Sequence, residues 1–234
     1  MADRRPRSRW IRGLTFSLIA VGAFVAWTLL LWSNFGAVQP GKLYRSAQLG
    51  GGELAAKIRG HRIKTVLNLR GSHPESAWYR DERAATLEAG ATQVDMPFSS
   101  CEWMSKAQAR ALLQVLETAD RPILVHCFHG SERTAMVSAF ALLLQPDSTL
   151  ADAEAQFTAR HLYFGLGDGV VTRQHLERYE DWLRGQSLAH NPDHLRDWLR
   201  SGYEPGQPCR DQWDHDPYPL VVVSKGIKKV ADRR

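Results

Sequence analysis

The sequence predicts an α/β fold in which a central, mostly parallel sheet is flanked by helices. Short apolar segments rich in branched residues alternate with segments of helical periodicity, which is typical of strand–helix–strand units. One of these short segments, 123–125, is apolar throughout, as a strand covered by helices on both faces is. With 234 residues, 44% of them hydrophobic, the chain is long enough for one folded domain with a sizeable core.

The expected elements follow one another from residue 42. Strands or extended segments are expected at 42–48, 63–69, 92–96 and 123–125. Helices are expected at 53–59, 74–89, 109–116, 136–144, 150–162, 172–183 and 193–199. Ser105 and Gln108 form a capping-box pattern before the third of these helices. Residues 202–234 contain four prolines and are expected to form an irregular tail.

The amino terminus combines an arginine-rich block with a long uncharged stretch. Residues 13–32 contain no charged side chain, and twenty residues in a helix span about 30 Å, the hydrocarbon thickness of a bilayer. Residues 13–33 are therefore expected to be a transmembrane helix, followed by a linker at 34–41. A buried core helix is disfavoured by the length of the stretch. A cleavable signal peptide is disfavoured because Phe35 is too large for the −3 position of a cleavage site.

Charge predicts the orientation of this segment. The first twelve residues carry five arginines, whereas only Lys42 and Arg45 are basic within about a dozen residues after the apolar stretch. The positive-inside rule then keeps residues 1–12 in the cytoplasm and places the domain at 42–201 outside it, at a cell (inner) membrane facing the periplasm. The net charge of +5 comes from the two ends, which contribute +4 each and leave the rest at −3. We expect no nucleic-acid partner, because that requires a basic surface on the folded domain.

The run PILVHCFHGSERT brings an apolar strand directly to a loop and the start of a helix. Loop amides and a helix N-terminus that point at one place bind an anion, and Gly130 permits close approach of the backbone. The same environment lowers the pKa of a thiol, so Cys127 is expected to be a thiolate, with Thr134 donating to it. The fork of Arg133 suits two phosphoryl oxygens. The residues expected to bind phosphate are Phe128, His129, Gly130, Ser131, Glu132 and Arg133.

This loop resembles a known signature. HCFHGSERT matches the HCxxGxxR pattern of the cysteine-dependent protein tyrosine and dual-specificity phosphatases, and LYRSAQ with IKTVLNLRG is similar to the opening of their atypical bacterial members. The resemblance covers roughly residues 42–183 and implies a domain of the dual-specificity phosphatase type that needs no metal or other cofactor. It implies that Cys127 attacks phosphorus to form a phosphocysteine, that Arg133 binds the phosphoryl group, and that water releases phosphate.

The general acid is left open. Dual-specificity phosphatases usually supply an aspartic acid from the loop after the strand at 92–96, but that loop reads PFSSCEWMS here. Three carboxylates are candidates. Asp95 precedes the proline and Glu102 lies in the loop. Glu132 stands immediately before the arginine, where some lipid-directed relatives resembling the myotubularins carry an acid.

The expected substrate is a phosphotyrosine or phosphoserine/threonine residue of a protein. A membrane lipid or glycan phosphate is the alternative, because the expected anchor would hold the pocket near a bilayer. A phosphate-binding module with weak or no catalysis is a second alternative. The loop contains no lysine, which argues against highly charged inositol polyphosphates.

Four further groups of residues have less specific interpretations. Cys101 is hypothesised to protect Cys127 as a reversible disulfide, the alternative being a small buried residue. His126, Cys127 and His129 could form a metal site, but their place in a loop that leads into a helix with an arginine favours an anion site. Arg45 and Arg70 could contact substrate or could tie the N-terminal segment to the sheet edge, and we expect the structural role. Cys209 is expected to lie in a solvated turn of the tail.

Overall fold

The computed structural model describes residues 6–31, 33–207 and 222–223, with side chains for 13–25, 33–167 and 169–207. The chain divides after Ser33 into two units, and each is described by itself. The first holds helix α1, Pro6–Leu31, on which large apolar side chains such as Phe16 are exposed.

In these described ranges, no helix combines the length and the hydropathy that a membrane crossing requires. The transmembrane helix predicted at 13–33 is therefore not supported by the structure. Its last side chains, at 26–32, lie outside the described residues.

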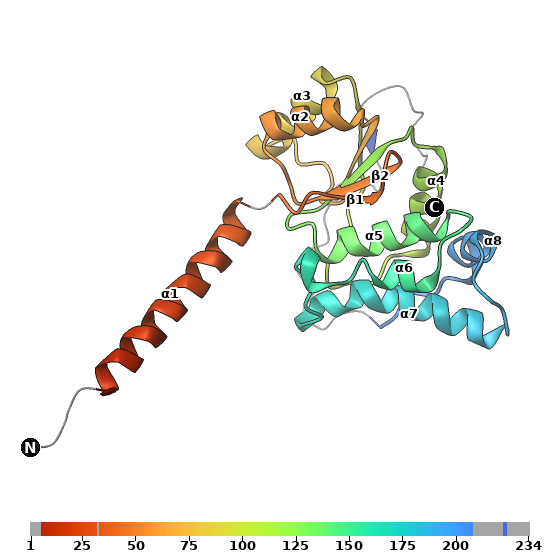
Figure 1. Ribbon diagram of the computed structural model, residues 1–234. Coiled ribbons are helices and arrows are strands. Elements are labelled where there is room, and N and C mark those ends of the chain that lie inside the picture. Colours follow the sequence, from red (N-terminus) through yellow and green to blue (C-terminus); the bar gives the residue numbers. More distant parts are fainter. Residues whose placement is uncertain (1–5, 32, 208–221, 224–234) are drawn as a thin grey trace, which may run out of the picture. The chain divides into compact units, whose positions relative to one another are not determined.

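The second unit contains a six-stranded mixed sheet with helices on both faces (Figure 1). The strand order is β1-β2-β5-β3-β4-β6, and the four central strands are parallel. Both edge strands are antiparallel to their neighbours, so the predicted parallel sheet is confirmed at its centre and corrected at its edges. The strands are β1 (Gly36–Gln39), β2 (Leu43–Ser46), β3 (Thr65–Asn68), β4 (Thr92–Asp95), β5 (Ile123–His126) and β6 (Val222–Val223).

The helices of this unit are α2 (Gly51–His61), α3 (Ala77–Glu88), α4 (Lys106–Thr118), α5 (Glu132–Leu143), α6 (Leu150–Glu154), α7 (Val170–Gly185) and α8 (Pro192–Asp197), with short helical turns η1 (Ala159–His161), η2 (Gly167–Gly169) and η3 (Trp198–Gly202). The capping box before α4 is confirmed by reciprocal hydrogen bonds between Ser105 and Gln108. The helix predicted at 150–162 ends at Glu154, and the carbonyl of Gln156 beyond its end accepts a hydrogen bond from Arg45.

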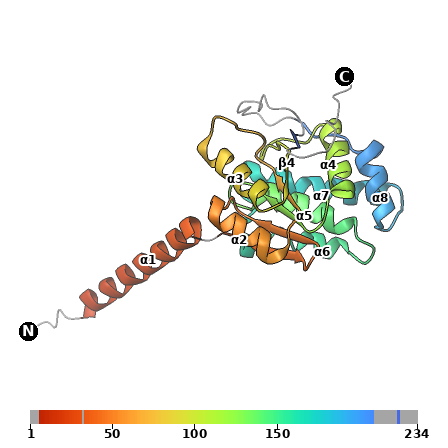
Figure 2. The same cartoon turned by 90° about the horizontal axis from the view of Figure 1, so that it is seen from above.

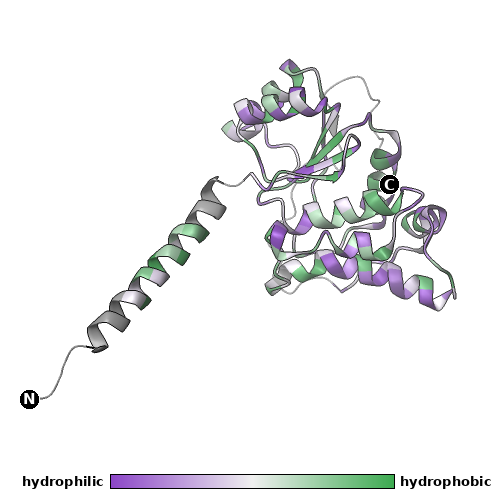
Figure 3. Ribbon diagram, viewed as in Figure 1, coloured by the Kyte–Doolittle hydropathy of each residue, from purple (hydrophilic) through white to green (hydrophobic). Residues whose placement is uncertain are grey.

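Side chains of successive strand residues point to opposite faces of the sheet, which gives the unit two apolar layers. On one face Val66 and Leu124 pack with residues of α2 and α3. On the other face Leu67 and Val125 pack with residues of α4 to α8 (Figures 1 and 2). Helix α5 is buried along almost its whole length, as its apolar sequence predicted. Polar and apolar residues are mixed along α7, which covers α5 (Figure 3).

Two segments predicted to be irregular contribute strands to the sheet. The predicted linker 34–41 contains β1, which forms a hairpin with β2 through a turn at Gly41, where φ is +74°. The predicted irregular tail 202–234 contains β6, which pairs with β4. Its residues 208–221 and 224–234, which include Cys209 and the basic end of the chain, lie outside the described residues.

Candidate active site

The loop that follows β5 is held from outside by hydrogen bonds to its carbonyl oxygens. The Asn34 side chain, 2% exposed, donates from Nδ2 to the carbonyls of His129 (3.0 Å), Gly130 (3.1 Å) and His161 (3.1 Å). The amide of Gln48 donates to the Phe128 carbonyl at 3.1 Å. Because the carbonyl groups are bound on this side, the loop amides are left for the concave side, as an anion cradle requires.

Arg45 of β2 provides a second support for the same loop. Its guanidinium donates from Nη2 to the Gly130 carbonyl at 2.8 Å and from Nη1 to the backbone and side-chain oxygens of Gln156, both at 3.1 Å. Burial lowers the pKa of Arg45 to about 10, although the negative charge of Cys127 opposes this shift. Arg45 therefore has the structural role that its sequence position predicted.

Gly130 occupies a position that a larger residue does not fit. Its φ is +68°, and a Cβ atom there would lie 2.5 Å from the Ser46 carbonyl oxygen and 2.6 Å from the Ala47 nitrogen. Both contacts are with backbone atoms, which cannot move away by a change of side-chain rotamer. The close approach predicted for Gly130 is made to β2 on the outer side of the loop.

Gly130→Ala is expected to lower the free energy of unfolding by at least about 2 kcal/mol, because a left-handed conformation and a backbone clash are both imposed. Gly52→Ala is the matched control, since Gly52 lies in α2 with nothing within 4 Å of the added Cβ. That control is expected to be neutral or slightly stabilising. Urea unfolding of the two variants measures the difference, and equal midpoints would contradict the close-approach interpretation.

Cys127 lies at the base of the cradle with 1% of its surface exposed. Burial by itself raises the pKa of the thiol, but the charge of Arg133, the hydroxyl of Thr134 and the amides of Thr134 and Gly130 outweigh it. The resulting pKa lies below the ordinary value. This is the environment that the sequence predicted for the thiol, and the role of Thr134 as a donor to a thiolate stays a prediction.

Arg133, at the second position of α5, is oriented by two carbonyl groups. Its Nη1 donates to Phe98 at 3.1 Å and to Leu69 at 3.4 Å. Its Nε is buried and has no hydrogen-bond partner among the described residues. A buried donor costs about 1–3 kcal/mol when left unpaired, so this edge of the guanidinium is suited to receive an anion.

A pocket of about 480 Å³ opens over Cys127 and is lined by Arg70, His73, Ser100, Cys127, Phe128, His129, Glu132 and Arg133. Arg70 lies 3.7 Å from the centroid of the Trp78 ring and 5.0 Å from that of Phe128. It therefore adds a second cation to the pocket, whereas its sequence position favoured a structural role over contact with substrate. The sequence signal for Arg70 as a pocket residue was its position just after β3. Ligands bind at the carboxyl ends of parallel strands.

The three general-acid candidates lie in different surroundings. Asp95 is fully buried and accepts hydrogen bonds from Asn68, Gln93 and Tyr79, away from the residues that line the pocket. Glu102 is partly exposed in the loop before α4 and does not line the pocket either. Glu132 lines the pocket from the first turn of α5. Glu132 is thus the candidate that the structure brings beside Cys127.

The remaining predictions concern metal and thiol chemistry. In the part of the chain that the structure describes, no group of three or more His, Cys, Asp or Glu side chains is arranged to hold a metal ion. Cys101 and Cys127 are both free thiols. The sulfur of Cys101 lies 3.3 Å from the Ser99 hydroxyl, in the loop after β4. The proposed protection of Cys127 by Cys101 stays a prediction.

Comparison with known proteins gives this site a family. The sequence model of the tyrosine phosphatase family matches residues 32–147, which include the whole loop from Cys127 to Arg133. The chain belongs to this family. No curated protein matches the phosphatase.

The phosphatase is also similar to solved structures. One is the core catalytic domain of the PP-IP phosphatase SIW14 from S. cerevisiae, at 21% identity and a TM-score of 0.51, with 68% of this chain and 96% of that chain covered. A second is P. aeruginosa TpbA, at 24% identity and a TM-score of 0.45, with 72% of this chain and 89% of that chain covered. The likeness to SIW14 shows a phosphatase-like α/β fold.

Asn34 was not predicted to contribute to the site, and its contribution is testable. Asn34→Ala removes the amide group that donates to three carbonyls, so we expect the free energy of unfolding to fall by about 2 kcal/mol and kcat to fall about tenfold. Asn191→Ala is the matched control, because Asn191 caps α8 through His194 far from the loop in sequence. The control should lose about 1 kcal/mol of stability with kcat unchanged. Equal kcat values for both variants would exclude a role for Asn34 in shaping the loop.

Proposed function

We propose that this phosphatase hydrolyses phosphate monoesters through a phosphocysteine intermediate on Cys127. The observation that supports this most directly is the buried Cys127, whose pKa is lowered mainly by Arg133 and Thr134 against the effect of burial. A thiolate at the base of an anion cradle is positioned to attack phosphorus, and the cradle places positive groups where charge develops.

The reaction has two steps. The Cys127 sulfur forms a bond to phosphorus as the phosphorus–oxygen bond of the leaving group breaks, and a general acid gives the leaving oxygen a proton. Water then attacks phosphorus and gives a proton to the carboxylate left by the first step, while the sulfur–phosphorus bond breaks, which releases inorganic phosphate and regenerates the thiolate. Arg133 and the loop amides hold the non-bridging phosphoryl oxygens in both steps. No group in this scheme changes its oxidation state.

The intermediate can be trapped directly. Full-length protein mixed with a ³²P-labelled aryl phosphate and quenched in acid within milliseconds is expected to carry label on the peptide that contains Cys127. Acid-stable label on a serine or histidine peptide, or no label during rapid turnover, would contradict the covalent route.

The proposed substrate is a phosphotyrosine residue, with dual specificity as the wider class. Phe128 is 53% exposed beside the pocket, and Trp78 flanks Arg70. Flat apolar surfaces next to cations suit an aromatic phosphate ester. A panel of phosphotyrosine and phosphoserine peptides, vesicles containing a phosphoinositide, and sugar phosphates tests this, with at least tenfold higher kcat/KM expected for phosphotyrosine. A preference for lipid or sugar phosphate would overturn the substrate and leave the hydrolysis intact.

Glu132 is proposed as the general acid because it alone of the three candidates lines the pocket. Glu132→Gln is expected to lower kcat about 10²-fold for an alkyl phosphate and to flatten the basic limb of its pH profile. p-Nitrophenyl phosphate should be affected far less, because its leaving group needs no proton. Glu102→Gln is the isosteric control. A larger loss in Glu102→Gln than in Glu132→Gln would transfer the role to the loop before α4.

Attachment to a membrane by residues 13–33, with the domain outside the cytoplasm, is a separate proposal. It is supported by the sequence, which has five arginines before a charge-free stretch of twenty residues, and by the exposed apolar side chains on α1. Alkaline phosphatase or a fluorescent protein fused to the C-terminus distinguishes the two sides. We expect activity of the first fusion only, and fluorescence of the second would place the domain in the cytoplasm.

A further inference from the structure

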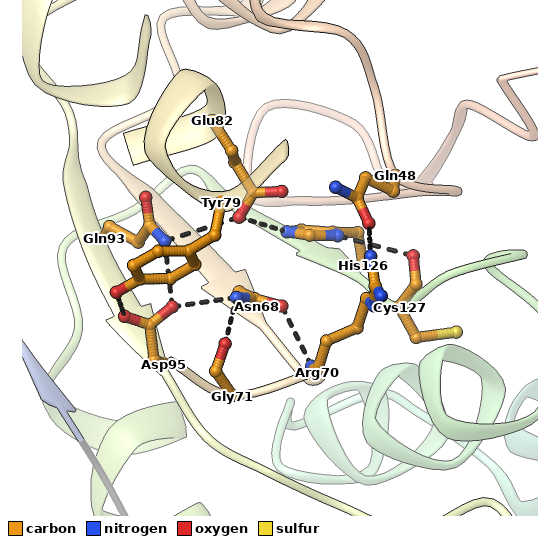
Figure 4. A network of polar contacts seen from close by, with 10 residues as sticks. All are labelled: Gln48, Asn68, Arg70, Gly71, Tyr79, Glu82, Gln93, Asp95, His126 and Cys127. Atoms are coloured by element: carbon orange, nitrogen blue, oxygen red, sulfur yellow. Dashed lines mark hydrogen bonds and ion pairs between the residues drawn. The ribbon is translucent and has the colours of Figure 1, made fainter. Parts of the chain in front are cut away.

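A chain of buried polar side chains lies behind the nucleophile (Figure 4). His126 is the last residue of β5 and directly precedes Cys127. Its Nε2 lies 3.2 Å from Oε1 of Glu82, and both side chains are at least 97% buried. Glu82 belongs to α3, whose buried residues pack on the face of the sheet opposite to α5. The nucleophile is thus connected, through its neighbour in the strand, to a carboxylate on α3.

The chain continues through an amide to a second carboxylate. Nε2 of Gln93 lies 3.4 Å from Oε1 of Glu82 and 2.8 Å from Oδ1 of Asp95. Asp95 also accepts from Nδ2 of Asn68 at 2.9 Å and from the Tyr79 hydroxyl. The Glu82 carboxylate accepts fewer hydrogen bonds than that of Asp95, because its Oε2 has no hydrogen-bond partner among the described residues. His126 is the residue with which the Glu82 carboxylate forms an ion pair.

The charges around His126 favour its ionised form. Burial lowers the pKa of His126, but the charge of Glu82, together with that of Cys127, raises it above the ordinary value. The other charges nearby are Arg70, which acts on both Glu82 and Cys127, and Asp95, which is joined to Glu82 through Gln93.

A buried ion pair adds little net stability, because desolvation offsets its attraction. The imidazolium is nevertheless placed next to the residue that must carry a negative charge. We propose that Glu82 is a positioning residue for the nucleophile, which holds a charged His126 directly behind Cys127 and so increases the thiolate population. The proposal rests on Cys127 as the nucleophile of the proposed function.

The test is the pH dependence of alkylation of Cys127 by iodoacetamide, which reports the thiolate and needs no phosphatase substrate. In Glu82→Gln we expect the midpoint to rise by about one pH unit, so that alkylation below both midpoints is about tenfold slower. Tyr79→Phe is the matched control, since Tyr79 lies one turn earlier on α3 and contacts Asp95 but not His126. Tyr79→Phe should lower the melting temperature of the protein without changing the pH midpoint of Cys127 alkylation. An unchanged midpoint in folded Glu82→Gln would overturn the proposal.

Two further measurements separate positioning from general damage. In a double-mutant cycle, Glu82→Gln should have no additional effect on the midpoint in a His126→Asn background, whereas additive effects would show that Glu82 does not act through His126. In the wild-type protein, the ring nitrogens of His126 should give the ¹⁵N NMR shifts of an imidazolium at pH 7. A neutral ring there would overturn the proposal even if Glu82→Gln does not fold. If the alkylation midpoint shifts as expected but the protein does not turn over phosphate monoesters, the result counts against the proposed function alone.

Discussion

Cys127→Ser is expected to lower the turnover of p-nitrophenyl phosphate by about 10⁴-fold or more, because the thiolate that attacks phosphorus is replaced by a hydroxyl with a much higher pKa. The fold should be unchanged, since Cys127 is fully buried and serine is slightly smaller. The variant should still bind inorganic phosphate, because the loop amides and Arg133 are intact. Steady-state kinetics and isothermal titration calorimetry measure the two properties.

The matched control for this variant is Cys101→Ser. Cys101 lies in the loop after β4 and does not line the pocket over Cys127. We therefore expect unchanged turnover in the control. Equal activity of the two variants would mean that the fold hosts a phosphate-binding module or uses another nucleophile.

Arg133→Lys is expected to lower kcat/KM by about 10³-fold. The guanidinium uses Nη1 to hold the carbonyls of Phe98 and Leu69, so its remaining edge is fixed for a phosphoryl group. A lysine ammonium keeps the charge but not the planar fork. Removal of one oriented donor to a transition-state anion costs 10²- to 10³-fold in other enzymes, at about 3 to 4 kcal/mol.

Arg196→Lys is the control for charge-conserving replacement of an arginine. Arg196 pairs with Glu117 and Asp193 on the surface, where such pairs contribute about 0 to 1 kcal/mol. Its activity should equal that of the wild type. If Arg133→Lys also retained most of the activity, simple charge rather than bidentate geometry would explain phosphate binding.

The loop at 127–133 could be predicted from the sequence because everything it needs is local. A strand, a glycine and the first turn of a helix follow each other without interruption, and their chemistry depends on residues within about two turns of each other. The parallel centre of the sheet could be predicted for a similar reason, since alternation of strands and helices leaves few topologies.

The supports of that loop could not be predicted in the same way. Asn34 reaches carbonyl groups 95 and 96 residues later in the chain, and an isolated asparagine gives no periodicity or motif. The edge strands β1 and β6 are equally long-range, because each depends on pairing with a neighbour rather than on its own few residues. Which carboxylate lies beside Cys127 is also a tertiary property. Asp95 and Glu132 are equally plausible general acids in the sequence, but Asp95 is buried at the end of β4 and accepts a hydrogen bond from Tyr79 of α3.

The dependence of the loop on Asn34, Arg45 and Gln48 has a practical consequence for shortened versions of the protein. A fragment that begins at residue 42, where the resemblance starts, keeps every residue of the signature but lacks the amide that binds three carbonyls. Such a fragment is expected to bind phosphate more weakly than one that begins at residue 33. During synthesis, Asn34 also emerges from the ribosome nearly a hundred residues before His129 and Gly130, so this support of the loop forms only after α2, α3 and α4 have been made.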